Sequence, residues 1–481
     1  MNGRHLSDRQ RRLLAHHRSP QVTTVSTSGS TGPARSYELL GPKDDLLSVK
    51  GDDPRLVKER IQSLLSQWMR MENVTVLIGA GASKAQSGPL LPELELFCLK
   101  GMEKLCVNDP LKQFASVVQE RKDKLDKRAT KLTFEQWLSH LTNAAHVLTA
   151  PETPVSSLSL CGKSGIKPVD LQEFLRVLSQ VVFMRCSIRL PSVRDAEVTG
   201  HHALVAKLIA RDPSLGRSSI FTTNYDTLIE QALDDLSIHY ADGFTGTIRR
   251  RFDPSCYGLD VYYPGDVAAG RVRRYDKFLH LYKLHGSVHW RRDGIDVIQV
   301  SDPRLGRWKE WDAKPTAEMQ AELERQFPID SGQLGILPTE CKFAETLGMP
   351  YAHIFRALHQ RLQEPQTFLL VLGYSFGDDH INRIIDDAMT NPSLVLLVVD
   401  PLPSAALRTR IDRYKKTGER AFLLNGVNLD PKKPEHGTFD DFAKNLLPNV
   451  QWLNDYIVLR KTEKVVHGAS DSDGLAPVPV V

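Results

Sequence analysis

The sequence contains few cysteines, and no two of them are close together. Six cysteines are spread over 481 residues, and the nearest pair, Cys98 and Cys106, is eight residues apart. Because structural zinc sites draw their ligands from closely spaced pairs such as C-x-x-C, the sequence predicts no zinc and no other bound metal. Scattered cysteines also favour the reducing cytoplasm over a secreted protein held together by disulfides.

Long apolar runs and a strong charge bias are also missing. No stretch of 18 apolar residues occurs, so no membrane span is expected. The formal net charge of +4 does not by itself predict nucleic-acid binding. Basic runs at 249–251 and 271–274 are interpreted as a solvated face, with a phosphate- or partner-binding patch as the alternative, so nucleic-acid binding stays open.

Hydrophobic residues make up 41% of the sequence, which is enough to form a large core. Residues 1–50 hold eight Lys+Arg and four Asp+Glu, and we expect a basic, partly disordered arm that docks on a neighbouring copy in a homo-oligomer. Residues 51–425 are expected to form one large domain, with a helical insertion at about 94–210 and an irregular insert at about 240–278. Residues 426–481 are expected to be a C-terminal extension and tail.

Short apolar strands alternate with amphipathic helices along this domain. The pattern predicts an α/β fold: a Rossmann-like parallel sheet with helices on both faces, plus the helical insertion. Expected strands lie at 74–78, 219–222, 279–284, 367–372 and 394–399; expected helices lie at 57–68, 133–147, 171–182, 203–210, 306–326 and 380–389. Residues 151–168 are expected to be a loop.

Polar loops follow four of these strands, and the carboxyl ends of parallel strands are where such sheets bind ligands. In Gly79–Ser83, glycines let the backbone approach a pyrophosphate; a tight turn without ligand is the alternative. In the loop 223–226, Asn224 offers both a donor and an acceptor, which suits orienting a carboxamide or a water. Asp226 either joins this site or only caps the next helix.

The other two loops add a base and further polar groups. His285 lies at a strand end beside Gly286, so it is expected to face a cleft and act as general base; a structural histidine is the alternative. In the loop 373–379, Ser375 is a candidate for phosphate or ribose, and Asp378 or Asp379 for a helix cap. Asp400, at the end of the next strand, is a candidate for ribose hydroxyls.

Four stretches in this order resemble the motifs of the SIR2 family: VLIGAGAS, FTTNYDTLIEQAL, YKLHGSVHW and LLVLGYSFGDDHINRII. The resemblance spans roughly residues 55–400, and the motifs are closer to the bacterial SIR2-like branch found in antiviral defence systems than to the protein deacetylases. It implies that residues 51–425 are a catalytic domain with NAD as substrate. The implied catalytic residues are Asn224, His285 and Asp226, and the implied NAD-binding residues are Gly79, Ala80, Gly81, Ser83, Thr223, Gly373, Ser375 and Asp400.

Departures from the family's protein deacetylases narrow the expected reaction. Their four-cysteine zinc module is missing, and Leu90-Leu91-Pro92 stands where they carry Asp-Phe-Arg. This favours hydrolysis of NAD+ to nicotinamide and ADP-ribose, by a toxic effector of a bacterial antiphage system. A nucleotide-sensing or scaffolding subunit is the alternative, followed by a protein deacylase or ADP-ribosyltransferase. The resemblance suggests an ATPase of the HerA type or a phage-derived activator as partner.

Overall fold

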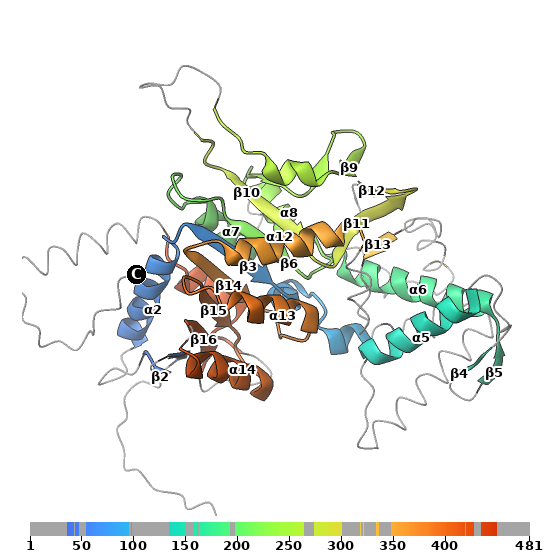
Figure 1. Cartoon of the computed structure of the whole chain (residues 1–481), viewed down its shortest axis with the longest axis horizontal. Helices are drawn as coiled ribbons and strands as arrows, with labels where there is room; N and C mark the ends of the chain where they lie inside the picture. Colours follow the sequence, from blue (N-terminus) through green and yellow to red (C-terminus); the bar gives the residue numbers. More distant parts are fainter. Residues whose placement is uncertain are drawn as a thin grey trace, which may run out of the picture.

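Figure 1 shows a computed structural model of the whole chain, in which most of the expected domain can be described in detail. The described residues are 36–42, 44–47, 54–95, 98, 134–149, 158–160, 163–192, 198–263, 274–300, 318, 321, 333–335, 348–418, 420–427 and 434–449. Of the expected charged helix 306–326 only residues 318 and 321 are described, and the final tail and most of the arm lie outside the described residues. Among the described helices, none has the length and apolarity needed to cross a membrane.

A nine-stranded sheet is the centre of the fold, in the order β2-β1-β16-β15-β14-β3-β6-β10-β7. The strands from β16 to β7 run parallel, whereas β1 and β2 form an antiparallel edge. The bounds are β1 Tyr37–Gly41, β2 Asp44–Asp45, β3 Asn73–Ile78, β6 Ser219–Thr222, β7 His239–Ala241, β10 Phe278–Lys283, β14 Thr367–Leu372, β15 Val395–Val399 and β16 Ala421–Gly426. The predicted parallel sheet is confirmed.

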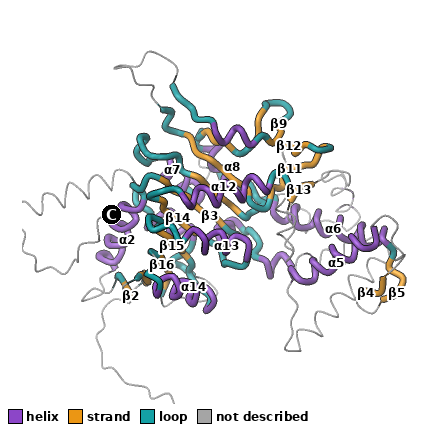
Figure 2. Tube along the Cα trace, viewed as in Figure 1, coloured by secondary structure: helices purple, strands orange, loops and turns teal. Residues whose placement is uncertain are grey.

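Helices cover both faces of this sheet (Figure 2), as the sequence predicted. One face packs against α2 (Pro54–Trp68), α7 (Gly200–Ile209) and α8 (Leu228–Asp235). The other packs against α12 (Tyr351–Gln363), α13 (Asp379–Ala388) and α14 (Ala405–Lys416). Successive side chains of a strand point to opposite faces, so Val76 and Ile78 of β3 join the first core while Leu77 joins the second.

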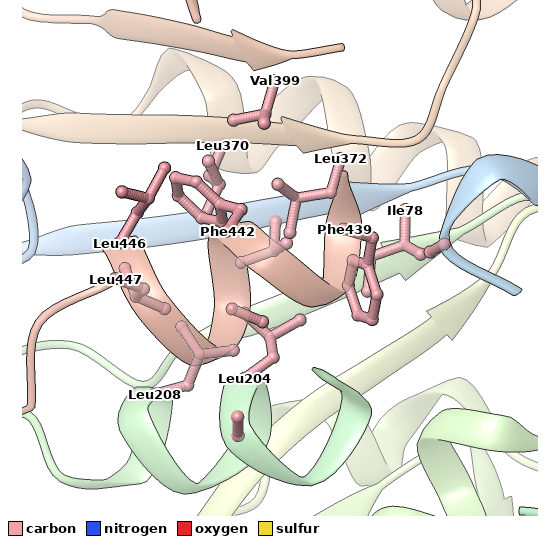
Figure 3. Close-up of a cluster of buried hydrophobic side chains, with 14 of the residues drawn as sticks. Ile78, Leu204, Leu208, Leu370, Leu372, Val399, Phe439, Phe442, Leu446 and Leu447 are labelled. Carbon is pink, nitrogen blue, oxygen red and sulfur yellow. The ribbon is translucent and has the colours of Figure 1, made fainter. Parts of the chain in front are cut away.

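The chain near its C-terminal end completes the first core. The short helices α15 (Phe439–Asp441) and η4 (Phe442–Leu446) place four large apolar side chains among Leu204, Leu370 and Val399 (Figure 3). These side chains are Phe439, Phe442, Leu446 and Leu447. Lys207 of α7 donates to the backbone oxygens of Ala443 and Leu447, which ties α7 to the end of this segment.

The inserts contain more regular structure than the sequence predicted. A hairpin of β4 (Leu158–Leu160) and β5 (Lys163–Ile166) lies in the stretch expected to be a loop, and that expectation is wrong. Beside it, α5 (Phe134–Thr149) and α6 (Pro168–Cys186) lie at the right in Figure 1. The irregular insert supplies β7 to the central sheet. It also supplies β8 (Phe244–Thr245) and β9 (Arg250–Phe252) to a second sheet, with β11 (Gly286–Asp293), β12 (Asp296–Gln299) and β13 (Gln333–Gly335), and a short helix, η2 (Pro254–Gly258).

A buried histidine in β10 makes stability depend on pH. Burial among aromatic rings, helped by Arg361, lowers the pKa of His280 from 6.5 to about 4. Because the folded pKa lies below the unfolded one, its contribution to stability is present above pH 6.5 and is lost as pH falls toward 4.

We therefore expect the free energy of unfolding to fall by about 2 kcal/mol from this group between pH 7 and pH 5. His280→Phe, which cannot bind a proton, should remove that part of the slope. Urea denaturation of both proteins at the two pH values measures it. An equal slope in both proteins would show that His280 is protonated freely in the folded state.

Candidate functional site

The candidate site lies at the carboxyl ends of four adjacent strands, β14, β3, β6 and β10. Backbone hydrogen bonds keep these ends level: the N–H of Gly79 donates to Leu372, that of Thr223 to Ile78, and that of Leu284 to Thr222. The chain adds strands on one side of β3 first and on the other side later, so strand order reverses beside β3. Parallel α/β sheets bind ligands at such a reversal.

The glycine loop after β3 forms a short 3-10 helix, η1 (Ala80–Gln86), rather than the start of a long helix. It packs against the loop after β14 with the two backbones in close approach. A Cβ on Gly79 would lie 2.6 Å from the Gly373 oxygen, and one on Gly373 would lie 2.4 Å from the Ala82 nitrogen. Gly373 also has φ +61°, where glycine is favoured. These glycines are therefore required for contact between the loops.

A buried hydrogen-bond network joins the glycine loop to the loop after β6. Nδ2 of Asn224 donates to the Gly79 oxygen at 3.1 Å and to Oγ of Ser83 at 2.9 Å. Oγ of Ser83 donates to Oδ2 of Asp226 at 2.7 Å. Asn224 and Asp226 are each 8% exposed. Among the described residues, Oδ1 of Asn224 is buried and has no hydrogen-bond partner, so it can accept from a ligand.

Asp226 has a structural contact as well. Its Oδ1 accepts from the N–H of Leu228 at 3.2 Å, at the start of α8, while Oδ2 binds Ser83. Asp226 therefore supports the chain just before α8 through one oxygen, although the N-cap position itself is Thr227, and contacts the glycine loop through the other.

A buried ion pair holds the backbone at Asp226 in place. Nζ of Lys283, at the end of β10, donates to the backbone oxygen of Asp226 and lies 3.1 Å from Oε1 of Glu230 in α8. Burial raises the pKa of the Glu230 carboxyl, and Lys283 opposes that rise. Neither Lys283 nor Glu230 was predicted from the sequence. A lysine at the end of an apolar strand was the available signal, because a buried charge requires a partner.

His285 follows β10 and is buried, at 7% exposed, whereas the sequence predicted a cleft-facing side chain. Its Nε2 lies 3.0 Å from Oδ2 of Asp378, and both side chains are largely shielded from water. The ring of Tyr225 lies 6.5 Å from the imidazole, centroid to centroid. Gly286 has φ +86°, so a glycine suits the sharp change of direction into β11.

The loop from Gly373 to Asp379 is braced by its own polar groups. Nδ2 of Asn382 donates to the Phe376 oxygen at 2.9 Å, and the Tyr374 hydroxyl donates to the Asp378 oxygen at 3.2 Å. Asp378 is the N-cap of α13 and accepts from the N–H of His380, as predicted for one of the two aspartates. Ser375 is exposed, so it is accessible to a phosphate or a ribose.

The structure thus gathers Gly79, Ser83, Asn224 and Asp226 in one network, next to the strand that leads to His285. Ala80 and Gly81 lie on the same loop, and Thr223 is held to Ile78 through its backbone. Asp400 lies one strand beyond β14, where its Oδ1 accepts from the N–H of Leu402. No described contact joins Asp400 to the network. The contact of His285 with Asp378 was not predicted.

Within the described ranges, no three His, Cys, Asp or Glu side chains are grouped as a metal site requires. Cys98, Cys186 and Cys256 are buried free thiols. Burial raises the pKa of the Cys186 thiol, which disfavours the thiolate that metals bind. Chemically, the site offers a buried amide, a hydroxyl–carboxylate pair and an imidazole–carboxylate pair. These groups can orient an amide or a sugar and accept a proton.

One family model matches part of the chain. Residues 218–418 match the family model described as SIR2-like domain, a span that includes the loops at 223–226, 285–287 and 373–379 but not the glycine loop. No curated protein matches the chain. Among solved structures, a mutant Sir2 homologue in complex with 2'-O-acetyl ADP ribose is similar at 11% identity. That comparison covers 72% of this chain and 87% of the other, with a TM-score of 0.29.

Proposed function

We propose that this protein is an NAD+ hydrolase that cleaves the bond between nicotinamide and ribose. The main support for the proposal is the buried Asn224–Ser83–Asp226 network, which lies beside the His285–Asp378 pair. In this network Oδ1 of Asn224 makes no described hydrogen bond and can accept one from the substrate. Similarity of residues 218–418 to the SIR2-like domain supports NAD as the substrate. The strand reversal beside β3 is the usual place for a dinucleotide in such a sheet.

The proposed binding mode for NAD takes into account which backbone N–H groups already make hydrogen bonds within the protein. The N–H groups of Gly79 and Gly81 already donate to Leu372 and Gly373, and a Cβ on either glycine would meet Gly373. These two glycines would therefore shape the pyrophosphate site by letting the two loops approach each other. Ala80 and Ser375 are exposed and would contact the phosphates or the ribose. Thr223 and Gly373 would line the same binding site, and Asp400 would reach the adenosine end.

The proposed reaction uses the charge of the substrate. The nicotinamide ring nitrogen is cationic, and it becomes neutral when the C–N bond breaks and takes the bonding electron pair. Water bonds to the anomeric carbon, and His285 accepts the proton that the water loses. Asn224 would orient the carboxamide or the water, and Asp226 would fix Ser83 and Asn224. Positioning and exclusion of bulk water supply the rest of the rate enhancement.

Incubating the purified protein with NAD and separating the products by chromatography tests the proposal. We expect nicotinamide and ADP-ribose in equal amounts, without any peptide acceptor, and no products from Asn224→Ala. Nicotinamide release that requires an acetyl-lysine peptide, together with about one zinc per chain by elemental analysis, would establish the deacylase instead. NAD binding without turnover, even after activation in infected cells, would establish the nucleotide-sensing subunit.

The biological setting is proposed from the family resemblance alone. It comprises a toxic effector role in antiphage defence and activation by a HerA-type ATPase or a phage-derived signal. Cytoplasmic location is proposed from the scattered cysteines, and homo-oligomer formation from the charge of the arm 1–50. Light scattering with and without the arm tests assembly, because a 54.0 kDa particle at all concentrations would contradict the oligomer.

A further inference from the structure

We propose that Asp378 is a positioning residue for His285: its carboxylate fixes the orientation of the imidazole and stabilises the positive charge that the ring acquires with a proton. The inference rests on the proposed function of His285 as base. It goes beyond a helix cap, the only role that the sequence predicted for this aspartate.

The two oxygens of Asp378 have separate partners. Oδ1 accepts from the N–H of His380 at 3.2 Å, which is the N-cap contact of α13. Oδ2 lies 3.0 Å from Nε2 of His285. The side chains of Asp378 and His285 are 6% and 8% exposed, so water screens their interaction little.

A cap alone does not explain a buried carboxylate at this position. Elsewhere in the chain, hydroxyl side chains perform the same capping: Ser404 caps α14, Thr199 caps α7 and Thr438 caps α15. A serine at 378 would satisfy α13 equally well, without the cost of removing a charge from water. The charge is accounted for by the imidazole that faces the second oxygen.

The carboxylate is held in place by the loop that carries it. The backbone oxygen of Asp378 accepts from the Tyr374 hydroxyl at 3.2 Å and from the N–H of Asn382 at 2.9 Å. Nδ2 of Asn382 holds the Phe376 oxygen, where the backbone has φ +58°. A carboxylate fixed 3.0 Å from the ring nitrogen attracts the protonated imidazole through its charge, although Nε2 and Oδ2 are not aligned for a hydrogen bond with each other.

Other titratable groups near the imidazole are consistent with this role. His380, in the first turn of α13, interacts electrostatically with His285, and burial lowers the pKa of His380, which favours its neutral form. Tyr225 faces the ring from the turn after β6. The carboxylate of Asp378 is therefore the anionic group in contact with the ring among these neighbours, and it favours the protonated imidazole.

The test compares Asp378→Asn and Asp378→Ser, which both keep a capping oxygen and remove the charge. We expect kcat for NAD cleavage to fall by about 10²-fold, with NAD affinity within about threefold. The acid limb of the kcat/KM profile should move to lower pH. Adding His285→Ala to Asp378→Asn should cost no more than His285→Ala alone, since both act on one group. Ser404→Ala, which removes a cap far from His285, is the control and should leave kcat unchanged.

A measurement independent of turnover separates this inference from the proposed function. The His285 ring can be titrated by NMR in histidine-labelled protein, with its signal assigned from the His285→Gln variant. We expect its midpoint to fall by about one pH unit or more in Asp378→Asn. An unchanged midpoint with an unchanged pH–rate profile, or additive losses in the double variant, would show that Asp378 is only a cap. If the parent protein does not cleave NAD, the proposed function fails while the titration still decides the pair.

Discussion

Asn224→Ala is expected to abolish the proposed NAD cleavage, with a loss of at least about 10³-fold in kcat in a protein that still folds. The substitution removes the amide that bridges Gly79 and Ser83, together with the buried Oδ1 that is available to the substrate. Ser83 keeps its hydrogen bond to Asp226, so the loop retains part of its support. Binding of NAD should stay within about tenfold, because the glycine loop and the adenosine side are unchanged.

His285→Ala should cause a similar loss, and the two losses should not add, since both groups act on one transition state. Steady-state kinetics, calorimetric NAD binding and circular dichroism together measure cleavage, affinity and fold. Turnover at the parent rate in His285→Ala under activating conditions would make the histidine structural. Parent-like biological activity in both variants would replace the enzyme by the sensing or scaffolding subunit.

Gly373→Ala should destabilise the protein by about 3 kcal/mol or more, a large share of the roughly 5–15 kcal/mol that is typical of a folded domain. The added Cβ would meet the Ala82 nitrogen at 2.4 Å, and φ +61° is unfavourable for alanine. Gly79→Val should behave similarly, because its Cβ would lie 2.6 Å from the Gly373 oxygen. We expect loss of NAD binding in both variants as a consequence of separating the two loops.

Gly377→Ala is the matched control in the same loop. Its Cβ would have Oγ of Ser375 as nearest neighbour at 3.5 Å, an ordinary contact, so we expect a change below about 1 kcal/mol. Urea denaturation of the three variants measures the difference. A Gly373→Ala protein as stable as Gly377→Ala would mean that the loops can move apart at little cost.

The sequence predicted the strands and the convergence of their loops because both follow from local pattern and from the parallel sheet. The five residues 368–372 are apolar without polar alternation, which indicates a strand buried on both faces. Once the strands are parallel, the loops after them must share one edge. The residues that form the Asn224–Ser83–Asp226 network were therefore predictable, although their hydrogen bonds were not.

Pairings between distant segments could not be predicted. His285 and Asp378 lie on different strands' loops, and a helix cap accounts for the aspartate equally well in a single sequence. The burial of His285 depends on α13, whose position the pattern does not define. The β4–β5 hairpin escaped detection because its strands are three and four residues long, too short for an alternating pattern to be recognised.

The pairing of β1 with β16, which are far apart in the sequence, has a consequence for biosynthesis. The hydroxyl of Tyr37 donates to Asp441 across 404 residues, and β1 pairs with β16. A ribosome emits the N-terminal end first, so β1 emerges long before its partner strand is translated. The first hydrophobic core also includes Phe442 and Leu447, so it cannot be completed before these residues are synthesised. Nascent chains of this protein should therefore stay incompletely folded until residues 421–447 have left the ribosome, and activity that depends on the first core should not appear before then.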